Sequence, residues 1–200
     1  MTSPAALAKA LIRRRGAVRS RELVEAGVAR AQVSRLVAAG DLVRLSRGVY
    51  TLPGMPQAEG DEGVLVVAQR IPGARLCLLT ALRLHELTTQ GPFEIWIAIG
   101  NKDRAPRLDW PSLRVVRFSS ETLATGLEIH KIGGRSVRVT SVAKTIADCF
   151  KFRNLVGLDV AIEALRDALR ARATTVDELW KYARICRVAK LMRPYLEAMA

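Results

Sequence analysis

Residues 29–52 read ARAQVSRLVAAGDLVRLSRGVYTL, and the spacing of the apolar residues changes halfway along this stretch. The first half repeats its apolar residues at helical spacing and ends at Gly40, which predicts a helix over 29–39. The second half alternates apolar and polar residues, which predicts two strands joined by a tight turn. These strands are predicted over 42–45 and 49–52.

Two further helices are predicted ahead of this stretch. Ser3 caps a helix that Gly16 ends, and Ser20 caps a short helix over 21–26. Three helices followed by a two-stranded hairpin is the winged helix-turn-helix arrangement, in which the third helix enters the major groove of DNA. We therefore predict a winged-helix DNA-binding domain over residues 1–52.

The outer side of the predicted third helix carries small residues interleaved with Arg and Gln, so this helix can approach base edges closely. Arg can pair bidentately with guanine and Gln with adenine, while arginines at helix ends and on the wing suit phosphates. Two alternatives are that these arginines are ordinary solvated residues and that the winged helix is a protein-interaction module. The candidate DNA-binding residues are Arg19, Arg21, Arg30, Gln32, Ser34, Arg35, Arg44 and Arg47.

The charge of the chain is concentrated near its start. The 200 residues have a formal net charge of +13, and residues 1–50 alone contain ten Lys or Arg against three acidic residues. A local basic excess of this kind is typical of a protein that binds the phosphate backbone of nucleic acids. A solvated basic face or an RNA-associated surface is the alternative at this point.

Cysteine usage and hydropathy indicate a cytoplasmic protein without a membrane partner. The three cysteines, Cys77, Cys149 and Cys186, are far apart, and none forms a Cys-x-x-Cys pair. No apolar run approaches the roughly 20 residues that a membrane-spanning helix needs. We expect three buried thiols.

The rest of the chain predicts a second, larger domain over 57–200, after a linker at 53–56 that is rich in Pro and Gly. Strands are predicted over 93–99 and 113–118, and Gly133–Gly134 predicts a hairpin turn. The predicted fold class is α+β: a winged helix-turn-helix, then a mixed α/β domain with a small sheet and a helical C-terminal tail. Helix starts are predicted at Thr80, Ser141 and Thr175.

Several segments resemble the AbiEi-type antitoxins, the antitoxin and repressor half of AbiE abortive-infection toxin–antitoxin pairs. In the segment 79–88 the family tends to have Gly where this chain has Glu86. The matching segments are GVAR at 27–30, VSRL at 33–36, GDL at 40–42, RLSRGVY at 44–50, LTALRLHELT at 79–88 and SVAKTIAD at 141–148.

The resemblance implies a repressor with two roles. The first domain would bind operator repeats in double-stranded DNA upstream of its own operon and repress that operon. The second domain would counteract a nucleotidyltransferase-like toxin without forming a stable complex, as in a type IV system for phage defence. A solitary regulator without a toxin partner, or a protein-interaction module, stays open as an alternative.

The sequence predicts no enzyme, no cofactor and no metal site. It contains no Asp-x-Asp pair, no Gly-rich phosphate loop and no Gly-x-Ser-x-Gly motif. The only two histidines are predicted to be a structural residue in an apolar helix, His85, and an exposed residue on a strand, His130.

Two further basic segments are candidates for a second phosphate contact or a partner surface, with ordinary solvated residues as the alternative. The first is the turn-rich loop 101–107, and the second is the polar side of the helical tail. The candidate residues are Lys102, Arg104, Arg107, Arg184, Arg187 and Lys190.

Overall fold

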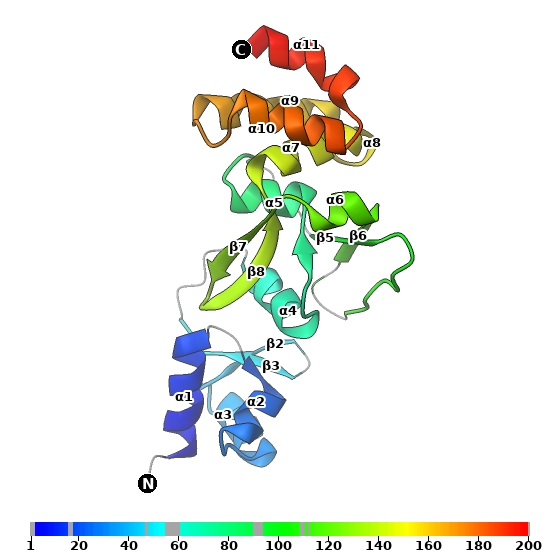
Figure 1. The fold of residues 1–200 in the computed structure, drawn as a ribbon. Helices are drawn as coiled ribbons and strands as arrows, with labels where there is room; N and C mark the ends of the chain where they lie inside the picture. Colours follow the sequence, from blue (N-terminus) through cyan, green and yellow to red (C-terminus); the bar gives the residue numbers. More distant parts are fainter. Residues whose placement is uncertain are drawn as a thin grey trace. The chain divides into compact units, whose positions relative to one another are not determined.

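The computed structural model describes residues 3–15, 18–46, 48–54, 61–89, 94–108, 111 and 113–199 (Figure 1). The chain divides into two compact units. The first, called the N-terminal unit below, comprises Met1–Gly73, Pro106–Ser112 and His130–Val137. The C-terminal unit comprises Ala74–Ala105, Leu113–Ile129 and Arg138–Ala200.

The N-terminal unit contains helices and a three-stranded antiparallel sheet in the order β1-β3-β2. The strand β1 was not predicted, because two residues are too few to show an alternating pattern. It pairs Val18 with Tyr50 and Arg19 with Val49. The elements are α1 (Pro4–Arg15), β1 (Val18–Arg19), α2 (Ser20–Glu25), α3 (Arg30–Ala38), β2 (Val43–Ser46), β3 (Val49–Thr51) and α4 (Glu62–Arg70).

The helix signals of this unit are mostly confirmed. The backbone N–H of Ala6 donates to Ser3 Oγ at 3.2 Å, and Gly40 follows α3 with a φ of +75°. Ser20 is not a cap: α2 starts one residue earlier than predicted, because the Glu22 carboxylate accepts the backbone N–H of Arg19 at 2.7 Å. A core of buried apolar residues joins the helices and strands: Ala8, Ile12, Val18, Leu23, Val28, Val33 and Leu42.

The C-terminal unit contains most of a mixed five-stranded sheet in the order β6-β5-β4-β8-β7, whose residues 130–132 and 135–137 are grouped with the N-terminal unit. β4 pairs antiparallel with β5 and parallel with β8, while β5 and β6 are parallel. The strands are β4 (Arg75–Leu76), β5 (Ile95–Gly100), β6 (Leu113–Phe118), β7 (Leu127–Ile132) and β8 (Arg135–Thr140). The fold class is therefore mixed α+β with two sheets, as the sequence predicted.

The helices of this unit include the predicted helical tail. Thr175 Oγ1 accepts the backbone N–H of Glu178 at 3.2 Å, which confirms the capping box predicted there. The helices share one apolar core with the sheet, and no helix among the described residues has the length and apolar character to cross a membrane. They are α5 (Leu78–Leu84), α6 (Ser120–Ala124), α7 (Val142–Lys151), α8 (Arg153–Val156), α9 (Leu158–Arg170), α10 (Val176–Ile185) and α11 (Ala189–Met199).

The start of α5 corrects a prediction. Thr80 does not cap this helix, which begins at Leu78 with Cys77 as its N-cap residue. The Thr80 side chain is fully buried, and its Oγ1 accepts the backbone N–H of Trp96 at 2.9 Å. The threonine therefore connects α5 to β5, a role that depends on a residue distant in the chain.

Candidate nucleic-acid interface

The helix α3 presents a basic side to solvent. Val33 is buried, whereas Arg30, Ser34 and Arg35 are exposed. The Ser34 hydroxyl donates to the Arg30 carbonyl at 3.3 Å, so it is used within the helix. Among these three exposed residues, the two arginines are therefore the ones whose side chains can extend to a ligand.

Gln32 has a local role that the sequence did not indicate. Its Oε1 accepts the backbone N–H of Ala29 at 3.0 Å, at the N-terminus of α3. Bidentate recognition of adenine needs both the carbonyl and the amide group of the side chain. Gln32 would have to break this bond to read adenine in that way.

Arginines from five elements meet at one concave site of about 470 Å³ in the N-terminal unit, called the arginine pocket below. Four of its residues were predicted DNA contacts, and Arg70, the last residue of α4, was not. No acidic side chain of the described residues lines this pocket. The lining residues are Arg19, Ser20, Arg21, Arg30, Arg44, Gly48, Tyr50 and Arg70.

Local backbone contacts place these residues. The backbone N–H of Ser20 donates to the Gly48 carbonyl at 2.9 Å, which holds the start of α2 against the turn before β3. Gly48 has a φ of +76°, and a Cβ added there would lie 3.4 Å from Ser20 Oγ and 3.9 Å from Arg70 Nη1. Glycine thus permits the positive φ of this turn, while a Cβ at this position would make only ordinary van der Waals contacts.

Arg19 is the most constrained cation of the pocket. It is half-buried, and its Nε is buried without a hydrogen-bond partner in the described structure. Burial lowers the pKa of the Arg19 guanidinium and the charge of Arg70 lowers it further, while the Glu22 carboxylate acts in the opposite direction. The Glu22 carboxylate also accepts a hydrogen bond from Arg135 Nη2 at 3.2 Å, so its negative charge acts on Arg135 as well as on Arg19.

The other predicted contacts are placed as follows. Arg21 lines the pocket but donates to Glu25 Oε1 at 2.7 Å, and this hydrogen bond raises its pKa. Arg35 and Gln32 line a separate, mostly apolar hollow of about 230 Å³ beside the start of α1. Arg47 lies outside the described residues.

The predicted second basic surface is exposed at each of its residues. Lys102 lines a hollow of about 490 Å³ in the C-terminal unit. The loop that carries it is held by Asp103, whose Oδ2 accepts the Gly100 N–H at 2.8 Å, and by Arg117, which donates to three loop carbonyls. The loop is therefore shaped by specific contacts. The remaining residues of the set are Arg104, Arg107, Arg184, Arg187 and Lys190.

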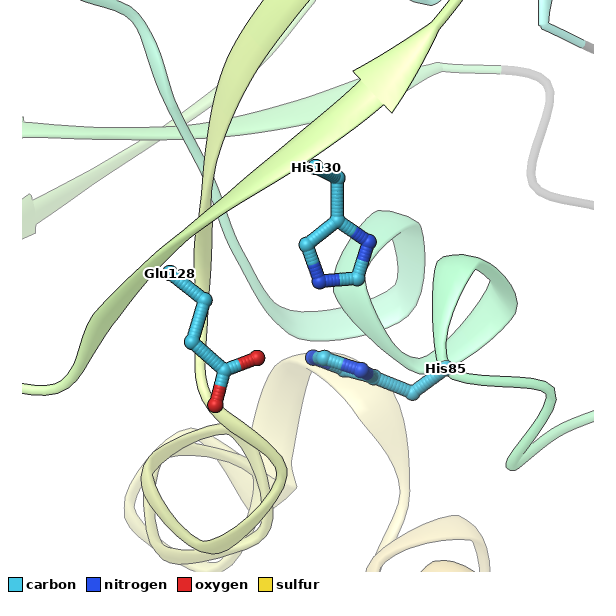
Figure 2. A group of neighbouring side chains, drawn as sticks. All are labelled: His85, Glu128 and His130. Carbon is cyan, nitrogen blue, oxygen red and sulfur yellow. The ribbon is translucent and has the colours of Figure 1, made fainter.

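The two histidines of the chain lie together with one carboxylate, as Figure 2 shows. His85 follows α5, while Glu128 and His130 are alternate residues of β7 and so share one face. One ligand atom from each lies within 4.8 Å of the others. Two imidazoles and a carboxylate are a donor set that zinc takes. The sequence did not predict this cluster, because the three residues do not have the spacing of a known metal-binding motif.

A hydrogen bond limits what His85 can offer a metal. Its Nε2 lies 2.7 Å from the Thr140 carbonyl oxygen, which can only accept, so Nε2 carries the proton. The lone pair for a metal would then be on Nδ1. His85 is half-buried, and His130 is half-buried where the sequence predicted exposure.

Comparison with known proteins gives a family match for the first part of the chain. Residues 6–53 match the family described as "Transcriptional regulator, AbiEi antitoxin". The resemblance to AbiEi antitoxins is thereby confirmed over this AbiEi-family segment, which contains every residue of the arginine pocket except Arg70. No curated protein matches the chain.

A solved structure shares the fold over nearly the whole chain. The crystal structure of the RV2827C protein from Mycobacterium tuberculosis is similar with a TM-score of 0.64 and 14% sequence identity. The match covers 96% of this chain and 77% of that one. At this identity the similarity describes the fold alone.

Proposed function

We propose that this protein is a sequence-specific, DNA-binding transcriptional repressor that acts as the antitoxin of an AbiE-like, type IV toxin–antitoxin system. The observation that carries the proposal is the arginine pocket beside the exposed side of α3, within a segment that matches the AbiEi family. The protein would act by binding, without catalysis or a cofactor.

The order of elements supports a winged-helix assignment for residues 1–52. Helices α1, α2 and α3 precede the hairpin of β2 and β3, and β1 adds a third strand. In this assignment α3 is the recognition helix and the hairpin is the wing. The exposed Arg30 and Arg35 of α3 would contact base edges, and Arg44 on β2 would contact a phosphate.

The antitoxin role rests on the family match. A repressor of this family would bind operator repeats upstream of its own operon and regulate it negatively. Its partner would be a nucleotidyltransferase-like toxin that it counteracts without a stable complex. The domain over 57–200, with the exposed Arg184, Arg187 and Lys190, would supply this second function.

The DNA-binding proposal is tested by fluorescence anisotropy on the full chain. The protein is titrated against its own upstream DNA and against a scrambled duplex at fixed salt, and then over a range of salt. The upstream DNA should bind at least ~10³ tighter than the scrambled duplex. Affinity should fall with salt at a log–log slope of roughly −0.9 per phosphate contact.

Two variants distinguish the loss of a base contact from the loss of one positive charge. Arg30→Ala should cost about 1–3 kcal/mol on the upstream DNA and less on the scrambled duplex, because it removes a base contact. Arg166→Ala removes an exposed arginine of α9 and should leave both affinities unchanged. Absence of binding to either duplex at low salt would overturn the proposal.

A further inference from the structure

We propose that the arginine pocket is a discrete binding site for one phosphate group. The group is either a phosphate of the DNA backbone or that of a soluble phosphate ester or polyphosphate. In the first case the inference rests on the proposed function and adds Arg70, which lies outside the AbiEi-family segment, to its DNA-binding residues.

The charge of the pocket calls for an anion. Five guanidinium groups line it, and none of the described lining residues is acidic. Like charges repel, and the half-buried Arg19 is shielded less by water than a surface residue is. A bound anion would reverse the sign of these interactions, so its binding is favoured by the arrangement of the free protein.

The donors of the pocket suit phosphate. Guanidinium groups present planar forks that pair with two phosphate oxygens at once, and the hydroxyls of Ser20 and Tyr50 can donate as well. The buried Nε of Arg19, which has no partner in the described structure, is a further donor that a ligand oxygen would satisfy. Donors from several elements match the several oxygens of a tetrahedral group better than those of a planar carboxylate.

The size of the pocket leaves room for more than the phosphate itself. A volume of about 470 Å³ lies within the range of ordinary ligand sites. It can hold the sugar next to a backbone phosphate or the rest of a soluble ester. Both kinds of ligand would therefore be bound through a phosphate group. A competition experiment with DNA decides which of them supplies it.

The test uses pyrophosphate as the probe and the full chain as the protein. Isothermal titration at low, constant ionic strength compares wild type with Arg70→Gln and Arg166→Gln. Arg70 and Arg166 are both exposed arginines, but only Arg70 lines the pocket. Thermal unfolding of each variant confirms that it is folded.

We expect one pyrophosphate per chain, with affinity reduced about tenfold or more in Arg70→Gln and unchanged in Arg166→Gln, because a charged hydrogen bond is lost only in the first. Equal affinities in the two variants would mean that net charge alone binds the anion and would overturn the site. Failure of wild type to bind pyrophosphate would also overturn it.

A second arm identifies the source of the phosphate. Pyrophosphate is added to the complex with upstream DNA, and Arg70→Gln is titrated with the same duplex. Displacement of DNA together with weaker DNA binding by Arg70→Gln assigns the pocket to a backbone phosphate. If pyrophosphate binds but does not displace DNA, and Arg70→Gln binds DNA as tightly as wild type, the pocket is assigned to a soluble ligand. If no DNA binds to wild type, the proposed function fails while the pyrophosphate result still decides the pocket.

Discussion

Lys144 and Asp148 form an ion pair in the interior of the C-terminal unit, with side chains 0% and 1% exposed. The ammonium of Lys144 also lies 4.6 Å from the centre of the Phe118 ring, and Cys186 Sγ donates to Asp148 Oδ1 at 3.3 Å. Burial raises the pKa of the Asp148 carboxyl, while the nearby Lys144 opposes that shift. The SVAKTIAD segment thus contributes a buried structural pair.

Removing one member of this pair should be costly. We expect Asp148→Ala to lower the free energy of unfolding by about 3–5 kcal/mol, because Lys144 is left as an uncompensated buried charge. Urea unfolding followed by circular dichroism measures the change. Asp167→Ala removes an exposed partner of Arg170 and should stay within about 1 kcal/mol of wild type.

The double variant Lys144→Met/Asp148→Leu separates charge from packing. It should recover most of the lost stability, because apolar residues of similar volume can replace a buried ion pair. A double variant as unstable as Asp148→Ala would mean that the site depends on its shape more than on charge balance.

Glu86 occupies a backbone position that favours glycine. It follows α5 with a φ of +58°, and the Leu87 N–H donates to the Leu82 carbonyl at 2.8 Å in a Schellman arrangement. We expect Glu86→Gly to be about 1 kcal/mol more stable than Glu86→Ala, since only glycine adopts this conformation without strain. Equal melting temperatures for the two variants would contradict this account.

The three thiols should be inert in the folded protein. Cys77, Cys149 and Cys186 are all buried, and burial raises the pKa of Cys186 to about 12. The thiolate is the reactive form, so little of it exists at neutral pH in the native state. A disulfide reagent such as DTNB should titrate no thiol at pH near neutrality and all three after addition of guanidinium. Fast reaction of one thiol in the native protein would show that it is accessible.

We expect the basic residues at the junction of α10 and α11 to contribute to function and not to the stability of the fold. Arg184, Arg187 and Lys190 are exposed, so replacing all three with Glu should leave the thermal unfolding transition close to that of wild type. Reversal of their charge should weaken DNA binding or toxin neutralisation, measured by anisotropy and by growth of cells that express the toxin. If both activities persist, these residues are only solvated.

The sequence alone determined the positions of most elements in the first part of the chain. Apolar residues at helical and then alternating spacing predicted α3, β2 and β3, and these local patterns persist because each element buries one side. Four of the five arginines of the pocket were also named as candidates from the sequence, since their types and their places at element ends are visible in the chain. The family resemblance came in part from the same residues, and the family match covers residues 6–53.

Only the tertiary structure decided which of these residues meet. Arg70 joins the pocket because α4 packs in the N-terminal unit, although it follows the predicted linker. Thr80 contacts Trp96 instead of capping a helix, and His85 lies beside β7. These contacts join residues far apart in the chain, and they depend on how the elements pack, which local spacing does not encode.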